Sequence, residues 1–499
     1  MPHNITRRSL LSAAALGVTA PPLMMSAQST PIATDIVDEV VIDLPSEPVN
    51  IHPARAYSDI EWSIVHSIFD PLVGFDADGT LRPIAAERFE LIDDVTWEVA
   101  LRPGMTFHDG SPVTSAAILR GFDLVKGSDS QVADIFGVIE NIDELDDLTA
   151  RITVSAPSPW LPAQMTSWHV LVPEGFEAEV PVGSGPYIFD SWSQGEEITL
   201  RRFTDYIPSQ AKGAAIAETV RYHFVPDVTT RSSNVLSGTS DIGTFMPIDA
   251  LGAFSDDKVE LKTTAVAGSW FIRVATEAAP FDDARVRQAL NLALDLDSFV
   301  GALVHEGSTR IASIYPGPVS MGFDAELAPY AYDPEAAKAL LAEAGYADGF
   351  DARMDLSSDA SKAIAEAMVS QWAEIGVNVE IIVSDLGTFN SGWSDPEAPE
   401  LRMVTWSPLF DPSTLLNLVF HSDGVLSRYR NADADDLINA GGSATDSAAR
   451  EEAYRELGSE LHTDAAAVFL WNLVNVAAVS KRASAWTPRP DQWVMALVR

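Results

Sequence analysis

Histidine, glycine and serine residues supply the motifs of this chain that come closest to reactive sites. Nine histidines are present, and none lies in an H-E-x-x-H motif or in a pair four residues apart, so their spacing predicts no metal centre. The stretch VGSGPYIFDSW from Val182 has the glycines of a phosphate loop and the serine of a hydrolase nucleophile turn. Both motifs open a helix, whereas here Pro186 removes a backbone amide and the next residues continue as a strand. The stretch therefore predicts a tight turn that leads into a hairpin of YIFDSW and EITLRRF.

An acidic loop has part of the pattern of a calcium-binding loop. Asp76, Asp78 and Glu87 occupy its first, third and twelfth places, but Leu81 occupies the sixth, where the sharp turn requires glycine. The DADG sequence is therefore expected to form a hairpin turn. We expect the chain to hold no metal and no cofactor, and its many carboxylates do not single out a pair for acid and base catalysis.

Tryptophan is the residue type with the clearest link to ligand binding. The chain has twelve, and several lie in polar or loop-like surroundings: Trp62, Trp168, Trp270, Trp393 and Trp406. Taken singly, each fits a core or a surface between lobes. Taken together, they suit a cleft that encloses a small molecule, because an indole offers a large apolar area and one hydrogen-bond donor.

The composition excludes several classes of partner and chemistry. The 32 Lys and Arg residues stand against 72 Asp and Glu, and the resulting net charge of −40 repels nucleic acids and anionic lipid surfaces. We interpret the acidity as a means of solubility or a response to a salty habitat, with an acidic face for a cationic ligand as the alternative. Cysteine is absent, which excludes disulfides, thiol catalysis and a lipid anchor on cysteine.

The amino terminus, ITRRSLLSAAALGVTAPPLMMSAQS, has the pattern of an export signal. Arg7 and Arg8 precede an uncharged run, and no acidic residue occurs before Asp35, which is similar to a twin-arginine signal. Residues 1–27 are therefore predicted to be a signal peptide removed after Ala27, with retention as a membrane anchor as the alternative. No later segment has about 18 consecutive apolar residues, so we expect an exported, periplasmic or extracytoplasmic protein that is soluble and not a lipoprotein.

Hydrophobic periodicity predicts alternating helices and strands in the second half of the chain. A helix is expected after Asp282 or Asp283 as its cap, and another begins at Pro334 with Asp333 as its cap. A further helix ends before a β-branched strand at Val377–Val383. Helix followed by strand, repeated, indicates an α/β lobe, and 499 residues predict at least two lobes.

Six segments stand in a characteristic order: FDPLVGFDADGTLRPIAAERFE, WEVALRPGMTFHDGSPVTSAAIL, VGSGPYIFDSW, LSGTSDIG, PFDDARVRQALNLALDLDSFV and WSPLFDP. Taken together they resemble family 5 of the extracytoplasmic solute-binding proteins of ABC importers, which includes dipeptide, oligopeptide and nickel-chelate receptors. The resemblance runs from about Val40 to the end of the chain. It implies an α/β, bilobal periplasmic-binding-protein fold, in which two lobes joined by hinge strands close on a ligand.

The resemblance also implies how the chain divides. The core of lobe I is expected to comprise residues 36–55, 178–268 and 471–499, with 56–177 inserted as a subdomain of that lobe. Lobe II is expected to be 269–470. In this scheme VGSGPYIF is the re-entry from the inserted subdomain into the core of lobe I.

Ligand chemistry is implied by the segment after Trp406. Peptide-binding members carry an aspartate three residues after the cleft tryptophan, which pairs with the ammonium of the peptide. This chain has Leu409 there, and a leucine cannot neutralise a buried ammonium, which argues against ordinary dipeptide recognition. The spacing to Asp411 is similar to that of the nickel-chelate receptors, but Phe410 stands where they have tyrosine, and Ser167 lies near where an arginine grips the chelator.

By this correspondence, the expected ligand-binding residues are Trp406, Phe410, Asp411, Trp270, Trp62, Ser58, Trp168 and His169. Asp411 has an alternative role, because it precedes Pro412 and is placed to cap the helix that begins there.

The resemblance implies a non-enzymatic receptor that captures a small solute between its lobes, as a monomer, and delivers it to the permease subunits of an ABC transporter. A peptide or a peptide-like molecule is the solute that the family favours, and a metal chelate or an oligosaccharide is the alternative. Rival functions are an exported hydrolase or chaperone on the same scaffold and a sensory or adhesive surface protein. The hydrolase would need a nucleophile with a base, or a metal set, and the sequence motifs supply neither.

Overall fold

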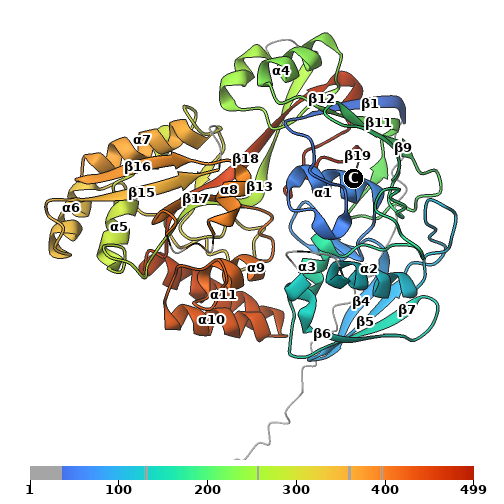
Figure 1. Ribbon diagram of the computed structural model, residues 1–499, viewed down its shortest axis with the longest axis horizontal. Helices are drawn as coiled ribbons and strands as arrows, with labels where there is room; N and C mark the ends of the chain where they lie inside the picture. Colours follow the sequence, from blue (N-terminus) through green and yellow to red (C-terminus); the bar gives the residue numbers. More distant parts are fainter. Residues whose placement is uncertain are drawn as a thin grey trace, which may run out of the picture.

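Two long antiparallel strands, β13 (Val259–Val274) and β18 (Ala467–Ser480), run through the middle of the molecule and join its two halves (Figure 1). They belong to one sheet with the strand order β16-β15-β17-β13-β18-β12-β1-β11-β9-β8, and β14 lies beside β18. The computed structural model describes residues 36–127, 130, 133–254, 258–357, 361–393, 395 and 397–498, so the predicted signal peptide lies outside the described residues. We call the half that contains β1 lobe I and the half that contains β15 and β16 lobe II.

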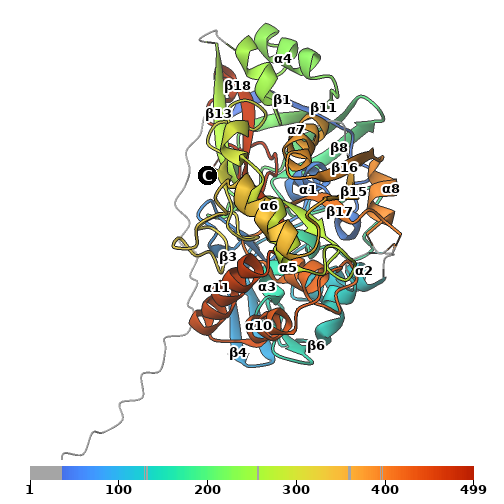
Figure 2. The same ribbon diagram turned by 90° about the vertical axis from the view of Figure 1, so that its left-hand side faces the viewer.

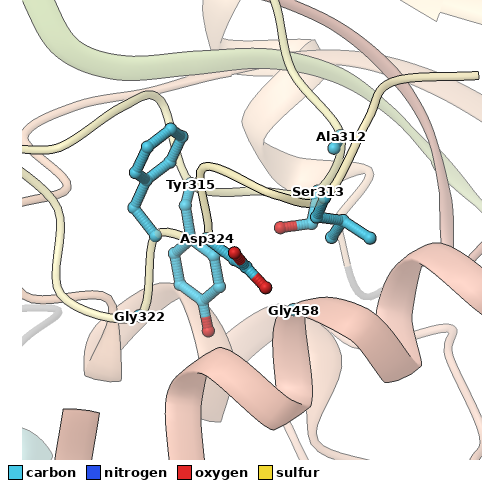
Figure 3. Close-up of a pocket in the computed structure, with 8 residues that line it drawn as sticks. Ala312, Ser313, Tyr315, Gly322, Asp324 and Gly458 are labelled. Carbon is cyan, nitrogen blue, oxygen red and sulfur yellow. The ribbon is translucent and has the colours of Figure 1, made fainter. Parts of the chain in front are cut away.

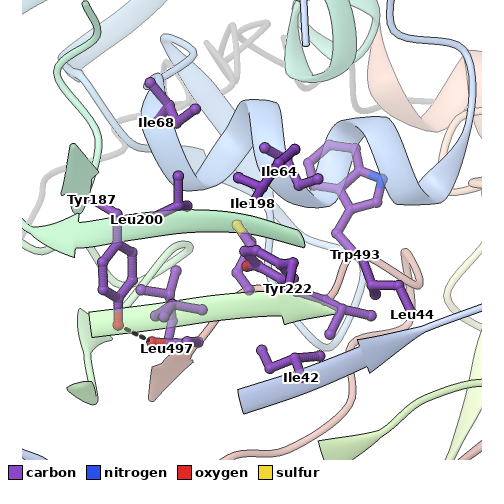
Figure 4. Packing of buried hydrophobic residues seen from close by; sticks show 14 of the residues in the cluster. Ile42, Leu44, Ile64, Ile68, Tyr187, Ile198, Leu200, Tyr222, Trp493 and Leu497 are labelled. Atoms are coloured by element: carbon purple, nitrogen blue, oxygen red, sulfur yellow. Dashed lines mark hydrogen bonds between the residues drawn. The ribbon is translucent and has the colours of Figure 1, made fainter. Parts of the chain in front are cut away.

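Both ends of the described chain build the main body of lobe I. Its elements are β1 (Val37–Leu44), α1 (Asp59–Ile68), β8 (Tyr187–Ser193), β9 (Glu197–Arg202), β10 (Ala214–Ala215), β11 (Ala217–Phe224), α4 (Val228–Ser237), β12 (Ile242–Gly243) and β19 (Leu497–Val498). Apolar side chains of β1, α1 and the last residues pack together in one core (Figure 4). The Tyr187 hydroxyl donates to the Ala496 carbonyl at 2.7 Å, and the Tyr222 hydroxyl donates to the Val494 carbonyl at 2.9 Å. The last residues of the chain therefore complete the core that the first strand begins.

A second part of lobe I has its own antiparallel sheet in the order β4-β5-β7-β6. Its elements are β2 (Val73–Phe75), β3 (Leu81–Pro83), β4 (Ala86–Asp93), β5 (Thr96–Leu101), α2 (Ala116–Gly127), β6 (Ile139–Glu144), β7 (Thr149–Val154) and α3 (Leu161–Trp168). This sheet and its two helices enclose a separate hydrophobic cluster. β2 and β3 pair antiparallel, and Asp76 N donates to Thr80 O at 3.0 Å, so the predicted hairpin turn at DADG is confirmed.

The VGSG stretch is a point of close backbone approach. A Cβ on Gly183 would lie 2.1 Å from the carbonyl oxygen of Ile68, and one on Gly185 would lie 2.7 Å from it. Gly185 N donates to that same oxygen at 2.8 Å. Only glycine permits this contact between the end of α1 and the start of the β8–β9 hairpin. The predicted hairpin and the architectural role of the stretch are both confirmed.

Lobe II is a sheet with a helical layer on each face. Its remaining elements are α5 (Ala284–Leu292), β14 (Thr309–Arg310), α6 (Pro334–Glu343), β15 (Phe350–Leu356), α7 (Lys362–Ala373), β16 (Val377–Val383), α8 (Leu386–Ser391), β17 (Leu401–Trp406), α9 (Ser413–Leu415), α10 (Ala432–Ser443) and α11 (Ser447–Thr463). Residues of α5, α6 and α7 pack on one face of the sheet, and residues of α9, α10 and α11 pack on the other. The side view in Figure 2 separates these layers.

The predicted caps of lobe II are present. The Asp283 side chain accepts from the backbone amide of Arg285, and the Asp333 side chain accepts from that of Ala336 with Pro334 at the first helical position. The predicted strand at Val377–Val383 is β16. Among the helices that the structure describes, none has the length and apolar character needed to cross a membrane.

Candidate functional site

The pairing of β13 and β18 is irregular where the strands pass from one lobe to the other. Regular pairing ends at Ala265 and resumes at Ser269, which lies opposite Asn472. The Asn472 side chain is 6% exposed and donates to the carbonyls of Val266 at 2.7 Å and Gly268 at 3.2 Å. One buried amide group therefore satisfies backbone carbonyls that the ladder leaves out, and it holds the crossing in a single geometry.

Segments of both lobes meet at this crossing. Ala267 N donates to Pro490 O of the carboxy-terminal segment at 2.8 Å, and Leu409 N of lobe II donates to Ala267 O at 2.5 Å. A Cβ on Gly268 would lie 2.9 Å from the Trp406 carbonyl oxygen, so this position requires glycine. The segment that begins at Trp406 and the end of lobe I therefore share one anchor on β13.

Trp406 and Phe410 lie on the lobe II side of this anchor. Trp406 is the last residue of β17, pairs with Ser269 and is partly buried against the α9–α11 layer. Phe410 is 4% exposed, and its ring stacks on Phe75 of the β2–β3 hairpin with ring centroids 4.5 Å apart. Phe410 is thus brought to the surface where lobe II touches lobe I.

Asp411 is occupied by contacts inside lobe II. Its two oxygens accept from Arg450 at 2.7 and 3.0 Å, and Oδ1 also accepts from the backbone amide of Ser413 at 3.0 Å. The amide at the start of α9 is therefore satisfied by this carboxylate, as a capping role predicts. The Arg450 pair leaves the Asp411 carboxylate no uncompensated charge to offer a solute.

Three of the predicted residues come together in lobe I. Ser58 is the cap of α1, with its hydroxyl accepting from Glu61 N while the Glu61 carboxylate accepts from Ser58 N. The rings of Trp62 and Trp168 meet edge to face at 5.9 Å, and the Trp168 indole donates to Ala56 O at 3.0 Å. The Trp62 indole N–H is buried and has no hydrogen-bond partner within the described part of the chain.

Trp493 completes this aromatic group and was not predicted from the sequence. Its ring lies 6.0 Å from that of Trp62 and stacks on His66 at 4.2 Å. Its indole N–H also lacks a partner among the described residues. Burial, with Lys212 and Arg489 nearby, lowers the pKa of His66 well below its usual range. The dense WTPRPDQW stretch was the available signal, but its partner on α1 is more than 400 residues away in sequence.

A carboxylate lies beside the aromatic group. Asp59, in the first turn of α1, accepts from the Gln492 side chain at 3.1 Å. Burial, and then the neighbouring Asp491 carboxylate, raise the pKa of Asp59 to about 7. Gln492 itself has a φ of 66°, a left-handed conformation that costs a non-glycine residue about 1–2 kcal/mol. The strained residue Gln492 lies two residues after the hinge contact at Pro490, and it contacts Asp59 directly.

Trp270 and His169 lie apart from these groups. Trp270 packs edge to face on Trp471 at 6.1 Å and faces the α5–α7 layer. His169 has no exposed surface; its Nε2 lies 3.0 Å from Ile118 O and its ring 4.1 Å from that of Phe122. Both side chains therefore pack against hydrophobic residues in the described structure.

Among the described residues, lobes I and II also meet at places away from the hinge. Phe75 stacks on Phe410, and a Cβ on the neighbouring Gly79 would lie 2.6 Å from Val319 O of lobe II. The Thr414 hydroxyl on α9 donates to Gln164 Oε1 on α3 at 2.5 Å. The Thr445 hydroxyl, just before α11, donates to Asp94 Oδ1 in the β4–β5 turn at 3.3 Å. No sequence pattern pointed to these contacts, because they join segments at least 240 residues apart.

One pocket of about 220 Å³, part of it open solvent, lies within lobe II and not between the lobes (Figure 3). Its walls are the loop that carries Tyr315 and Phe323 and the helix α11 at Gly458. Asp324 supplies a carboxylate to its lining, and Arg455 approaches that carboxylate at 3.8 Å. Within the residues that the structure describes, no group of three or more His, Asp or Glu side chains is placed to hold a metal ion.

We predict that His169 makes the protein less stable in acid. Burial lowers the pKa of His169 from 6.5 to about 4, so between these values the unfolded chain binds more protons than the folded chain, and stability falls as the pH drops below 6.5. The loss from pH 7 to pH 5 is about 2 kcal/mol for this residue. A His169→Gln variant should lose about that much less between the two pH values in urea unfolding, and His421→Gln serves as a control on the surface of lobe II. Equal losses in His169→Gln and the parent protein would contradict this assignment.

Known proteins with the same architecture are similar to this chain. The chain matches the family model of bacterial extracellular solute-binding proteins, family 5 Middle, over residues 80–427. The glutathione-binding protein GsiB of Pectobacterium atrosepticum is 28% identical over 98% of this chain and 97% of its own length. The structure of the ABC transporter substrate-binding protein CtaP from Listeria monocytogenes has a TM-score of 0.81 at 22% identity and covers 92% of this chain and 98% of CtaP. AgaA from A. tumefaciens R10, in complex with agropinic acid, has a TM-score of 0.75 at 25% identity and covers 89% and 93% of the two chains.

These neighbours confirm the α/β, bilobal periplasmic-binding-protein fold that the six sequence segments implied. The family model spans well over half of the chain. It includes the hinge strand β13, the Trp406–Asp411 segment and strand β3 of the β2–β3 hairpin. The chain belongs to family 5 of the bacterial extracellular solute-binding proteins.

Proposed function

We propose that the protein captures a peptide or a peptide-like solute between lobes I and II, as a monomer, and delivers it unchanged to the permease subunits of an ABC importer. The observation that carries this proposal is the junction itself: two lobes share a two-strand hinge, and aromatic side chains stand on either side of it at Trp406 and at Trp62. Family membership supplies the receptor role. GsiB binds glutathione, which is a tripeptide, and AgaA binds agropinic acid, so peptide-like acids are the solute class that the relatives favour.

We further propose that delivery depends on lobe closure. The moving bodies are lobe I, made of residues 36–55, 178–268 and 471–499 with 56–177 inserted, and lobe II, residues 269–470. The contacts of Phe75 with Phe410 and of Gln164 with Thr414 support this proposal, and we assign them to the closed state. A solute that touches both lobes would stabilise this state over an open one, and the permease would recognise the closed surface.

Replacing Phe75 with alanine should shift the protein toward the open state. An aromatic pair of this kind contributes about 0.5–1.5 kcal/mol, so the ratio of closed to open molecules should fall about two- to tenfold. Solution X-ray scattering of the solute-free protein should then give a larger radius of gyration for Phe75→Ala than for Phe189→Ala, an aromatic residue on the edge strand of lobe I. Identical profiles for the two variants and the parent would count against closure at this contact.

The proposed function is tested by native mass spectrometry of protein purified gently from its own host. A bound mass that disappears on denaturation identifies the solute and is expected to be a peptide or a related acid. Trp406→Ala should weaken binding of that solute by about 2 kcal/mol, roughly 30-fold, because buried aromatic anchors carry much of the binding energy. Trp192→Ala, on the far side of lobe I, should bind normally.

A protein that arrives without a bound mass is titrated with glutathione, tripeptides and a nickel–histidine chelate. Saturable binding of glutathione or a tripeptide supports the proposal. Binding of the chelate alone would replace the peptide assignment, and turnover of any of these compounds would overturn the receptor role.

We also propose export through the twin-arginine pathway, without a lipid anchor. Changing both Arg7 and Arg8 to lysine should retain the precursor inside the cell, because that pathway reads the arginine pair. A matched control is the Arg201→Lys, Arg202→Lys variant, which alters an adjacent arginine pair in β9. Normal secretion of the Arg7→Lys, Arg8→Lys variant, measured by cell fractionation, would assign the signal to the general pathway.

A further inference from the structure

Arg273 is a buried guanidinium that forms no ion pair with a carboxylate of the described residues. It lies on β13 and is 2% exposed. Its Nη1 donates to the carbonyls of Trp393 at 3.1 Å and Leu426 at 3.0 Å. Its Nε and Nη2 are buried and have no hydrogen-bond partner within the described chain. These two groups form one edge of the guanidinium, the edge that receives both oxygens of a carboxylate in a bidentate pair.

The neighbouring Arg402 shows this edge in use. Arg402 lies directly opposite Arg273 in the β13–β17 ladder. Its Nε donates to Asp355 Oδ1 at 3.1 Å, and its Nη2 donates to Asp355 Oδ2 at 2.6 Å. A third arginine nearby, Arg428, is paired with Glu277 at 2.5 Å. Each nearby carboxylate is thus bound to another arginine, and Arg273 is left with an unmatched positive charge.

The surroundings of Arg273 favour an anion. Burial, then the charges of Arg402 and Arg428, lower the pKa of Arg273 to about 9, so the group is still cationic at neutral pH. The Trp393 ring lies 5.0 Å from Cζ of Arg273 and 5.1 Å from Cζ of Arg402, and its π face offsets part of the two charges. The ring accepts no hydrogen bond in the plane of the Arg273 fork. Buried N–H groups left in this state are costly, and an oxyanion would satisfy both at once.

We propose that Arg273 binds a carboxylate, or an oxyanion of the same shape, through Nε and Nη2 beneath Trp393. Trp393 is only partly buried, so the segment that covers the guanidinium lies at the surface and gives an anion a route to it. The carboxylate has two possible sources, a free small anion or the solute itself.

The second source places the carboxylate of the solute at Arg273 and the rest of the solute toward Trp406, on one face of the sheet. Side chains of alternate residues share a face, so Trp406, Val404 and Arg402 of β17 lie on the same side, with Arg273 opposite Arg402. Four residues of strand span about 13 Å, which is the reach of an extended tripeptide or tetrapeptide. This second source rests on the proposed function, whereas the first does not.

The first arm of the test uses sodium acetate as the probe, at constant ionic strength, on the mature protein. If a free anion is bound, the midpoint of thermal unfolding should rise saturably by about 2–4 °C in the parent and not in Arg273→Gln. Arg353→Gln, which alters a half-exposed arginine on strand β15 of the same sheet, should respond like the parent. An acetate response that Arg273→Gln retains in full would overturn the free-anion source.

The second arm compares trialanine with trialanine amide by calorimetry. If the carboxylate belongs to the solute, the parent should bind the acid at least tenfold more tightly than the amide, and Arg273→Gln should remove this difference. Should Arg273→Gln fail to fold, Arg273→Lys keeps the charge but lacks the bidentate edge, and the same two losses are expected of it. A parent with neither an acetate response nor discrimination between the two peptides overturns the proposal. In that case a native solute that still depends on Trp406 would leave the receptor function standing.

Discussion

The pairing of β13 with β18 is the constraint on which the rest of the structure depends. These strands are the part of the sheet that both lobes share. The geometry of their crossing therefore sets how the two lobes lie relative to one another. Asn472 fixes that crossing by satisfying the carbonyls of Val266 and Gly268. Backbone contacts then tie Leu409 from one lobe and Pro490 from the other to Ala267 between them. In the lobe closure proposed above, a small change at this crossing would separate Phe410 from Phe75 by a larger distance.

Buried charges divide into those that hold the frame and those that remain available. Lys212 and Asp70 pair at 2.6 Å in lobe I, and Arg450 and Asp411 pair at 2.7 Å in lobe II. Breaking such a pair leaves a buried charge uncompensated, so these groups fix local geometry and have little left for a solute. Arg273 and Asp59 differ, since neither has an opposite charge within ion-pair distance among the described residues. Asp59 lies in lobe I beside Gln492, near the hinge contact at Pro490, and Arg273 lies in lobe II on the hinge strand β13.

Local features were predictable from the sequence, and long-range ones were not. The caps Asp283 and Asp333 and the turn at Gly183 follow from rules that span a few residues, and the structure has each of them. The order of the six segments implied the bilobal fold as a whole. The surroundings of individual candidate residues could not be predicted in the same way. His169 lies in a segment that aligns with the family, but its side chain is buried against Phe122. Trp493 and the contacts between Phe75 and Phe410 arise from tertiary packing between distant segments, which periodicity in one sequence does not encode.

The closing of the lobe I core by Trp493 to Leu497 bears on the order in which the chain can fold. The clusters of lobe II draw on residues 271–471, all of which are synthesised before residues 493–497. The core around β1 includes residues from Val40 to Leu497, and the hydroxyls of Tyr187 and Tyr222 find their acceptors at Ala496 and Val494. β1 must therefore wait for residues 493–497 before its core is complete. Until these residues have been made, the growing chain exposes the apolar surface that they will cover.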